Sequence, residues 1–466
     1  MTLSASSLRS LLNAVVAHRR GSLAALVGVL VIVLGTVWVA AQPGGPRPSP
    51  QAPAAQAPVP GQSTSSPRAP SGHPSTPAAG GGSNPGVTAS PGTPVPSPPP
   101  PSPSYSPSPS TLSMRVSGNH LMDGAGKTVV LRGVNLSGTE FACIQGGTPT
   151  SRGWSIYGGQ PFDRASTYAA IVSWHANVVR VPLNEDCWLG ISGVNPAYGG
   201  AAYRAAIQTE VSLIHQAGLY AVLDLHWTSP GPYAGYSQQP MPDADHSIAF
   251  WQSIAGTFKS DHSVIFDLFN EPFFYYISDG SDQWTCWLKG CAMNQFISAG
   301  QTAPDGSTTG YTTSYSWRTA GMQAMIDAVR DTGATQPVLV NGVDWGNDLS
   351  GWLAHQPSDP RGQLVAGWHS YPQQGCSPQS CWTSVIQPIA AKVPVLVGET
   401  GDNVQDPMSY VDTFLPWADS HGVSYLGWTW NPWQDPKNVL IKDWTGTPTT
   451  NWGTYYRNHL AAVAGP

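Results

Sequence analysis

The sequence predicts an α/β fold, a (β/α)8 TIM barrel preceded by a disordered Pro/Ser-rich linker. The first observation is a repeat: from residue 113 onward, an amphipathic stretch, a turn and a short apolar run recur. The second is their number, because eight such apolar runs occur. Strands that alternate with helices form a parallel sheet, and eight units close into a barrel. An open doubly wound sheet is the alternative, but no strand is followed by the Gly-x-Gly-x-x-Gly motif of dinucleotide-binding sheets.

Residues 1–41 are predicted to direct export. Arg9, Arg19 and Arg20 precede an uncharged apolar run over 23–41, and a positive flank before such a run is typical of an export signal. The run ends in the small residues Val39-Ala40-Ala41, which offer a cleavage point for removal of the signal. It is also just long enough to span a bilayer, so membrane attachment through residues 23–41 is the alternative to secretion.

Residues 42–112 are predicted to form a disordered linker. Of the 45 prolines in the chain, 22 lie between Pro43 and Pro109, and the segment carries no Asp or Glu. Such a composition buries too little apolar surface to offset the entropy of ordering. We expect a spacer, stiff and extended where proline is densest, that holds residues 113–466 away from a membrane or cell wall.

The composition of the folded part favours a neutral substrate. Five of the 21 basic residues precede residue 113, so the rest of the chain carries 16 basic and 27 acidic groups, a net charge of −11. This balance disfavours nucleic acid as a partner. Eighteen of the 19 tryptophans lie in the same part, and tryptophan rings stack on the apolar faces of sugars as well as filling cores. We expect a monomer.

Six cysteines indicate three disulfide bonds. Cys286 and Cys291 are five residues apart, as are Cys376 and Cys381. An even cysteine count in an exported chain favours disulfides, and these local pairs are the stronger predictions. The remaining pair is Cys143–Cys187. None of these spacings resembles Cys-x-x-Cys, so no structural zinc site is expected.

Helix and strand periodicity places the elements. Tyr203, Ile207, Val211 and Ile214 are spaced for one helical face, and Gly218 should end that helix before the third strand. Similar faces occur within 248–258 and 322–329. The eight predicted strands cover residues 129–133, 177–181, 219–225, 264–269, 337–340, 364–368, 393–398 and 424–428.

Polar and aromatic residues gather at the C-terminal ends of these strands, where barrels of this class carry their active sites. Residues two apart on a strand point the same way, so Trp428 and Trp430 are expected on one face. One such residue alone would be explained by structure. Together they indicate an active site with two isolated carboxylates. The set is Arg180, Asp224, His226, Asn270, Glu271, His369, Tyr371, Glu399, Trp428 and Trp430.

The segment from about Leu131 to Trp433 resembles glycoside hydrolase family 5. The most specific part is Asn270-Glu271-Pro272 after the fourth strand, joined by Glu399 after the seventh. The resemblance implies a retaining glycosidase with Glu271 as general acid/base and Glu399 as nucleophile. It also implies active-site roles for Arg180, His226, Asn270, His369, Tyr371 and Trp428. One departure is Glu399-Thr400-Gly401, where the family often has Glu-Phe-Gly.

Retaining hydrolysis needs two carboxyl groups in different environments. We expect Arg180 and Tyr371 to donate to Glu399 and keep it ionised, and a carboxylate neighbour and aromatic walls to raise the pKa of Glu271. We expect Asn270 to contact the sugar 2-hydroxyl, and His226 and His369 to orient these groups by hydrogen bonds. Trp428 is expected to form a floor under the reacting sugar. Neighbouring subsites are expected to be lined by Trp227, Trp345 and Trp430.

The leading functional hypothesis is an endo-β-1,4-glucanase that needs no cofactor. Mannan, xyloglucan and exo-acting β-glucosidase activities share the mechanism and stay open. A catalytically silent glycan-binding barrel and a structural surface protein are alternatives, but opposed carboxylates have no use in either. A metallohydrolase is disfavoured, because those barrels usually carry His-x-His on the first strand and this chain has Val-Leu-Arg-Gly-Val there.

Overall fold

The computed structural model describes residues 112–144, 156–157, 161–297, 313–402, 408–433 and 438–464. The predicted export segment, and all of the linker except residue 112, lie outside these ranges. Within them, no helix is both long and apolar enough to cross a lipid bilayer.

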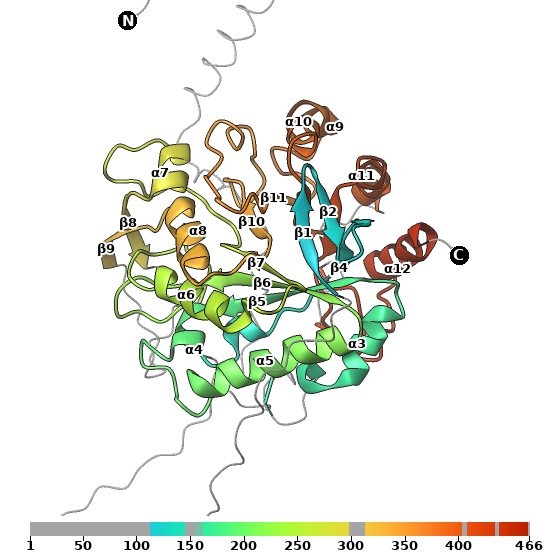
Figure 1. Cartoon of the computed structure of the whole chain (residues 1–466), viewed down its shortest axis with the longest axis horizontal. Helices are drawn as coiled ribbons and strands as arrows, with labels where there is room; N and C mark the ends of the chain where they lie inside the picture. The colour runs from blue at the N-terminus through green and yellow to red at the C-terminus, as the bar shows by residue number, and fades with distance from the viewer. Residues whose placement is uncertain are drawn as a thin grey trace, which may run out of the picture. The chain divides into compact units, whose positions relative to one another are not determined.

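Eight parallel strands close into a barrel, as predicted (Figure 1). Each strand pairs with its neighbour in chain order, and the last pairs with the first, where Tyr425 lies opposite Arg132. Most predicted strand positions agree within three residues, because a run buried on both faces is read directly from its apolar residues. The strands are β4 (Arg132–Asn135), β5 (Val178–Asn184), β6 (Tyr220–Trp227), β7 (Val264–Asp267), β10 (Val338–Asn341), β11 (Leu364–Ser370), β12 (Val395–Thr400) and β13 (Ser424–Gly427).

Helices surround the barrel (Figure 1). The predicted face of α5 is fully buried at Tyr203, Ile207, Val211 and Ile214, and Gly218 follows the helix with a left-handed φ of 80°. The longer helices are α3 (Ala165–Val172), α5 (Ala201–Gln216), α6 (Ser247–Phe258), α8 (Met322–Asp331), α11 (Ser409–Ser420) and α12 (Trp452–Val463). The short ones are α4 (Glu185–Leu189), α7 (Gln283–Lys289), α9 (Gln379–Cys381), α10 (Gln387–Ala390), η1 (Thr139–Phe141), η2 (Pro161–Asp163) and η3 (Trp382–Ile386).

A small antiparallel sheet covers the N-terminal end of the barrel. Its strands are β1 (Met114–Ser117), β2 (His120–Asp123) and β3 (Thr128–Val129). Its buried side chains pack against residues from the first half of the barrel strands, among them Val178 and Tyr220. This cap leaves the C-terminal end of the barrel for a site.

The connections at that end differ in length. Between β7 and α8 lies a long insertion with α7 and an antiparallel hairpin, β8 (Ala292–Ile297) and β9 (Thr313–Arg318). The structure contains the three expected disulfides. Cys143–Cys187 joins the segment after β4 to α4, and the other two, Cys286–Cys291 and Cys376–Cys381, close local turns.

Candidate active site

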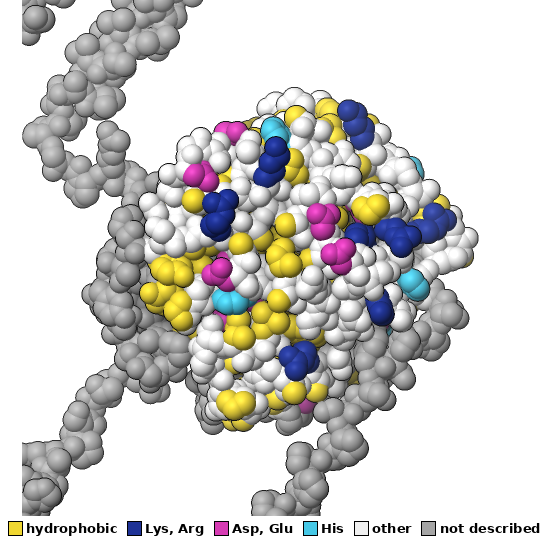
Figure 2. Space-filling view, turned by 60° about the vertical axis from the view of Figure 1, so that its left-hand side comes forward, with side chains coloured by type: hydrophobic (Ala, Val, Ile, Leu, Met, Phe, Trp, Pro, Cys, Tyr) yellow, Lys and Arg dark blue, Asp and Glu magenta, His cyan; other side chains and the backbone are white. Residues whose placement is uncertain are grey.

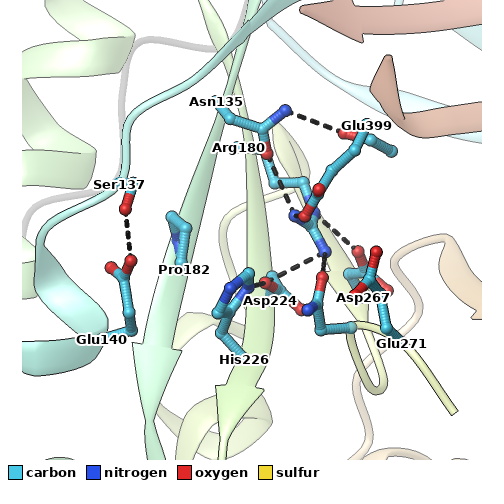
Figure 3. Close-up of polar contacts among 12 residues, drawn as sticks. Asn135, Ser137, Glu140, Arg180, Pro182, Asp224, His226, Asp267, Glu271 and Glu399 are labelled. Atoms are coloured by element: carbon cyan, nitrogen blue, oxygen red, sulfur yellow. Dashed lines mark hydrogen bonds and ion pairs between the residues drawn. The ribbon is translucent and has the colours of Figure 1, made fainter. Parts of the chain in front are cut away.

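Arg180 lies at the centre of the polar residues at the C-terminal end of the barrel (Figure 3). Its side chain is fully buried on β5. Nη1 donates to Glu399 Oε1 at 2.9 Å and Nη2 to Asn270 Oδ1 at 2.9 Å. The same guanidinium contacts Asp224 Oδ2 at 3.0 Å and Asp267 Oδ2 at 2.9 Å. With Asn135 on β4, whose Oδ1 accepts from Nη1 at 3.0 Å, five strands are tied together through one buried cation.

The charge of Arg180 is secured by its neighbours. Burial alone would lower its pKa, but the carboxyl groups of Asp224, Asp267 and Glu399 raise it overall. Burial in turn raises the pKa of Asp224 to about 7, against the opposing effect of Arg180. Burial also raises the pKa of Asp267 well above its usual range. A buried charge is tolerated only when it is paired and hydrogen-bonded, and Arg180 meets both conditions.

Glu399 is held at both carboxylate oxygens. Arg180 donates to Oε1, and the Tyr371 hydroxyl donates to Oε2 at 3.0 Å. Burial and the nearby Glu399 raise the pKa of Tyr371 well above its usual range, so this hydroxyl keeps its proton and remains a donor. Two donors therefore fix the orientation of the Glu399 carboxylate.

Glu271 occupies a different environment. Its Oε1 lies 2.9 Å from His369 Nδ1, and its Oε2 accepts from Gln238 Nε2 at 2.8 Å. Burial raises the pKa of Glu271 to about 7, although the bond from Gln238 works in the opposite direction. Burial lowers the pKa of His369 to about 3, so its ring is neutral near pH 7. Glu271 can therefore hold or release a proton in the neutral range.

The two glutamates lie close together. One oxygen of Glu271, one oxygen of Glu399 and a ring nitrogen of His369 all lie within 4.8 Å of one another. Retaining glycosidases place their carboxyl groups about 5–5.5 Å apart, whereas inverting enzymes need about 6.5–9.5 Å to admit a water molecule. The spacing fits direct attack by a carboxylate on the sugar.

The same three atoms, from Glu271, His369 and Glu399, are also close enough together to ligate a metal ion. However, both Glu399 oxygens already accept hydrogen bonds, one of them from the Arg180 guanidinium 2.9 Å away. This fixed positive charge opposes a second cation at the same carboxylate.

Two glycines leave room for the His369 ring. A Cβ atom at Gly398 would lie 2.9 Å from His369 Nε2, and one at Gly346 would lie 3.1 Å from Cγ. The first contact is closer than a methyl group tolerates, and the second is tight enough that the His369 ring would have to shift. The backbone of β12 and the turn after β10 therefore position the ring against Glu271.

Trp428 and His226 form a stacked pair beside the carboxylates. Their rings are nearly parallel, at 6°, with centroids 5.8 Å apart. His226 Nδ1 lies 2.6 Å from Asp224 Oδ2, which fixes the ring. Trp428 is half-buried and keeps part of its indole accessible, whereas His226 is buried.

The predictions for the outer tryptophans differ in outcome. Trp430 does not line a subsite, because it is fully buried and packs on Trp174 with ring centroids 4.7 Å apart. The prediction was wrong because β13 ends at Gly427, so strand alternation does not extend to residue 430. Trp227 is only 6% exposed and lies against Phe141, which leaves little ring surface for a sugar.

Trp345 stands next to the Asn270-Glu271-Pro272 segment, where its backbone N–H donates to Pro272 O at 3.0 Å. It is partly exposed and stacks on Phe273 with centroids 5.2 Å apart. Tyr275, which is 60% exposed, lies 5.4 Å from the Trp345 ring. Phe273, Trp345 and Tyr275 thus make an aromatic platform beside Glu271.

Sequence reasoning missed several polar residues at this site. Asn135 donates to Gly398 O and accepts from Arg180, and Asp267 also pairs with Arg180. Their strand-end positions could have identified both. Glu140, a fully buried carboxyl that accepts from Ser137 Oγ (Figure 3), and Gln238 come from segments without a periodic pattern, so no sequence signal marked them.

Charged side chains are sparse on the face drawn in Figure 2, where acidic and basic groups are scattered among neutral ones. A surface of this kind provides no continuous charged track for a polyanion.

Comparison with known proteins places the chain among glycosidases. The model of the cellulase family, glycosyl hydrolase family 5, matches residues 122–434. A mannan endo-1,4-beta-mannosidase of Streptomyces lividans is 23% identical over 368 residues, 75% of this chain and 76% of that protein. A probable endo-beta-1,4-glucanase B of Neosartorya fischeri is 30% identical over 199 residues, 43% of this chain and 55% of that protein. The solved structure of a beta-glucanase from Saccharophagus degradans shares the fold, with a TM-score of 0.54, 22% identity and coverage of 76% of this chain and 95% of that chain.

Proposed function

The chain belongs to glycosyl hydrolase family 5. On this premise we propose that it is a retaining endo-hydrolase of β-1,4-linked neutral polysaccharide, and that glucan is its leading candidate substrate. The observation that carries the proposal is the pair formed by Glu271 and Glu399. The two carboxyl groups are close enough for the retaining mechanism. Their surroundings differ, because burial raises the pKa of Glu271 to about 7 whereas Glu399 accepts from the Arg180 guanidinium.

In the first step, Glu399 attacks the anomeric carbon. A bond forms between a Glu399 oxygen and that carbon while the glycosidic carbon–oxygen bond breaks. Glu271 transfers its proton to the departing oxygen, so the leaving sugar departs as a neutral alcohol. The donors Arg180 and Tyr371 keep Glu399 ionised until the bond forms.

In the second step, water replaces Glu399. Glu271, now a carboxylate, takes a proton from the water molecule as its oxygen attacks the anomeric carbon. The bond to Glu399 breaks, which restores both side chains. Two inversions at one carbon give net retention. A pKa near 7 suits a group that must both give and accept a proton.

The remaining residues bind the sugar in this proposal. Asn270 uses Oδ1 to accept from Arg180, which leaves its NH2 group for the 2-hydroxyl of the reacting sugar. Trp428 offers its ring as the floor beneath that sugar. The platform of Phe273, Trp345 and Tyr275 would stack a neighbouring sugar unit.

Mannan is the second candidate substrate. The Streptomyces lividans mannosidase aligns with three quarters of this chain, whereas the glucanase of Neosartorya fischeri aligns with a shorter part at higher identity. Glucan and mannan differ at the 2-hydroxyl, so the contact proposed for Asn270 bears on the choice.

We also propose that the protein is exported. Three disulfides are typical of a chain that folds in an oxidising compartment. In this proposal, residues 1–41 direct export, residues 42–112 form a spacer and residues 113–466 form the catalytic domain, a monomer without a nucleic-acid partner.

The test is reducing-end release from carboxymethylcellulose, with mannan and xylan in parallel. Wild type is compared with Glu271→Gln and with Asp331→Asn, a control on the exposed end of α8. We expect activity on carboxymethylcellulose that Glu271→Gln abolishes and Asp331→Asn retains. Activity on mannan alone would show that mannan rather than glucan is the substrate, and it would leave the proposed mechanism unchanged. Full activity in Glu271→Gln would overturn the assignment of the general acid.

A further inference from the structure

A second cluster of acidic residues lies beside the active site and plays no part in the mechanism above. Glu185 is the first residue of α4, directly after β5. Asp243 and His246 lie at the end of the loop 228–246, which joins β6 to α6. Glu185 and Asp243 are fully buried, and the His246 side chain is 24% exposed. The cluster therefore joins two connections at the catalytic end of the barrel.

Ser247 fixes the orientation of both carboxyl groups. Its Oγ donates to Glu185 Oε2 at 2.5 Å and lies 3.5 Å from Asp243 Oδ2. The other oxygen of each group lies near His246, and Asp243 Oδ1 also accepts from the backbone N–H groups of Asp245 at 3.0 Å and His246 at 2.8 Å. Glu185 Oε1 lies 3.8 Å and Asp243 Oδ1 3.4 Å from His246 Nδ1. One carboxylate oxygen of Glu185, one of Asp243 and a ring nitrogen of His246 lie within 4.8 Å of one another.

One of these atoms has no N–H or hydroxyl donor among the residues that the structure describes. It is Glu185 Oε1, which is buried, and the hydrogen bond between the Glu185 and Asp243 side chains forms only when one of the two carboxyl groups keeps a proton. Asp186, the next residue, adds another buried carboxyl group. Across the described ranges, no Lys or Arg forms an ion pair with Glu185, Asp186 or Asp243. Buried carboxylates without a cation are costly, so such a group either keeps a proton or binds a positive ion.

We propose that Glu185, Asp243 and His246 bind a divalent transition-metal ion of the Zn²⁺ type. Two ligand atoms about 2.1 Å from a tetrahedral Zn²⁺ lie about 3.4 Å apart, close to the separations seen from His246 Nδ1. A ring nitrogen among the ligands favours Zn²⁺ over Ca²⁺ or Mg²⁺, which prefer oxygen throughout. The alternative is a proton shared by Glu185 and Asp243, with His246 Nδ1 directed at Ser229 O, 3.3 Å away.

The ion would anchor the loop that reaches the active site. Asp243 and His246 hold its end, and Glu185 belongs to α4, which the Cys143–Cys187 disulfide also ties down. The same loop carries Gln238, whose side chain donates to Glu271. Binding of the ion should therefore stabilise the folded chain and order this loop.

The experiment is calorimetric titration of the full chain, freed of metal with a chelator, with Zn²⁺ at pH 7. Ca²⁺ and Mg²⁺ are titrated in parallel, and thermal unfolding is followed with and without each ion. We expect one saturable Zn²⁺ site and a midpoint of unfolding raised by a few degrees. Neither result depends on hydrolytic activity, so the outcome is separate from that of the proposed function.

Three variants locate the site. His246→Ala removes the partly exposed ligand, and Glu185→Gln keeps the shape of the buried one. Asp245→Asn is the matched control, because this exposed neighbour accepts from Gly231 N outside the cluster. We expect His246→Ala and Glu185→Gln to weaken Zn²⁺ binding at least about tenfold and the control to leave it unchanged.

If Glu185→Gln fails to fold, the Zn²⁺ affinity of His246→Ala alone decides whether the ion binds at this cluster. No saturable Zn²⁺ binding by wild type would overturn the proposal in favour of a shared proton. Equal binding by wild type and His246→Ala, or binding of Ca²⁺ without Zn²⁺, would overturn it as well.

Discussion

Glu271 and Glu399 carry the same functional group in two environments. Glu399 accepts from a guanidinium and a phenol, both of which stabilise its charge. Glu271 faces a neutral imidazole and one amide, so burial dominates and raises its pKa to about 7. The difference in function proposed for the two residues follows from these neighbours.

The role proposed for Glu399 can be tested by removing its carboxylate. Glu399→Gly should lower kcat by several orders of magnitude, because no nucleophile remains. Azide, which fits the vacated space, should restore turnover and give a glycosyl azide of inverted configuration. Product analysis by NMR distinguishes this result from residual wild-type activity. Rescue with retained configuration would contradict the assignment.

The pH dependence should report Glu271. Only its protonated form can donate to the leaving oxygen, so kcat/KM should fall as pH rises through about 7. The bond from Gln238 favours the ionised form and holds this pKa down. Gln238→Leu should therefore move the alkaline limb of the profile to higher pH. Gln208→Leu on α5 should leave it in place. An unchanged limb in Gln238→Leu would show that another group controls it.

At the scale of elements, the strands could be predicted from their apolar runs, and the site where its residues lie on the strands or shortly after them. Arg180, His369 and Glu399 are carried by β5, β11 and β12, so strand-end reasoning found them. It failed at Trp430, which lies beyond the end of β13. Gln238, Phe273 and Tyr275, which the sequence did not indicate, come from loops, whose paths depend on tertiary contacts. Local sequence does not specify those contacts.

The close fit of the His369 ring between β12 and the turn after β10 gives a test at this scale. Gly398→Ala would place a methyl group 2.9 Å from His369 Nε2 and push the ring from Glu271. We expect kcat to fall about tenfold or more, since small displacements at a catalytic group are costly. Gly256→Ala, in the middle of α6 with open space around it, is the control. It should keep full activity and stabilise the fold by about 0.5–1 kcal/mol. Equal activity in both variants would contradict the role given to Gly398.

At the scale of the molecule, distant segments meet at one end of the barrel because all eight parallel strands end there. The cap formed by β1–β3 seals the N-terminal end, and the helices bury the outer face. Parallel strands then bring residues as far apart in the chain as Arg180 and Glu399 into contact. The cluster of Glu185, Asp243 and His246 arises in the same way from adjacent βα connections. Asp243 and His246 are three residues apart, but Glu185 lies far from both in the sequence, so no local motif reveals the cluster.

The disulfides should contribute unequally to stability. Cys143–Cys187 closes a span of 44 residues, whereas Cys376–Cys381 closes a span of 5. Loop-closure entropy gives about 4 kcal/mol for the first and about 2 kcal/mol for the second. We expect the Cys143→Ser/Cys187→Ser double variant to lower the unfolding midpoint by about 5 °C, and the Cys376→Ser/Cys381→Ser variant by about 3 °C. Calorimetry would contradict this order if the Cys376→Ser/Cys381→Ser variant showed the larger fall in unfolding midpoint.

The central claim is that Glu271 and Glu399 act together in retaining hydrolysis. The most direct test is proton NMR of the sugar anomer first released from a β-1,4-linked hexasaccharide, of glucose or of mannose, that the enzyme cleaves. One oxygen of Glu271 lies within 4.8 Å of one oxygen of Glu399, and this closeness predicts that the β anomer appears first and then mutarotates. Initial release of the α anomer would mean that a water molecule attacks directly, and it would contradict the mechanism.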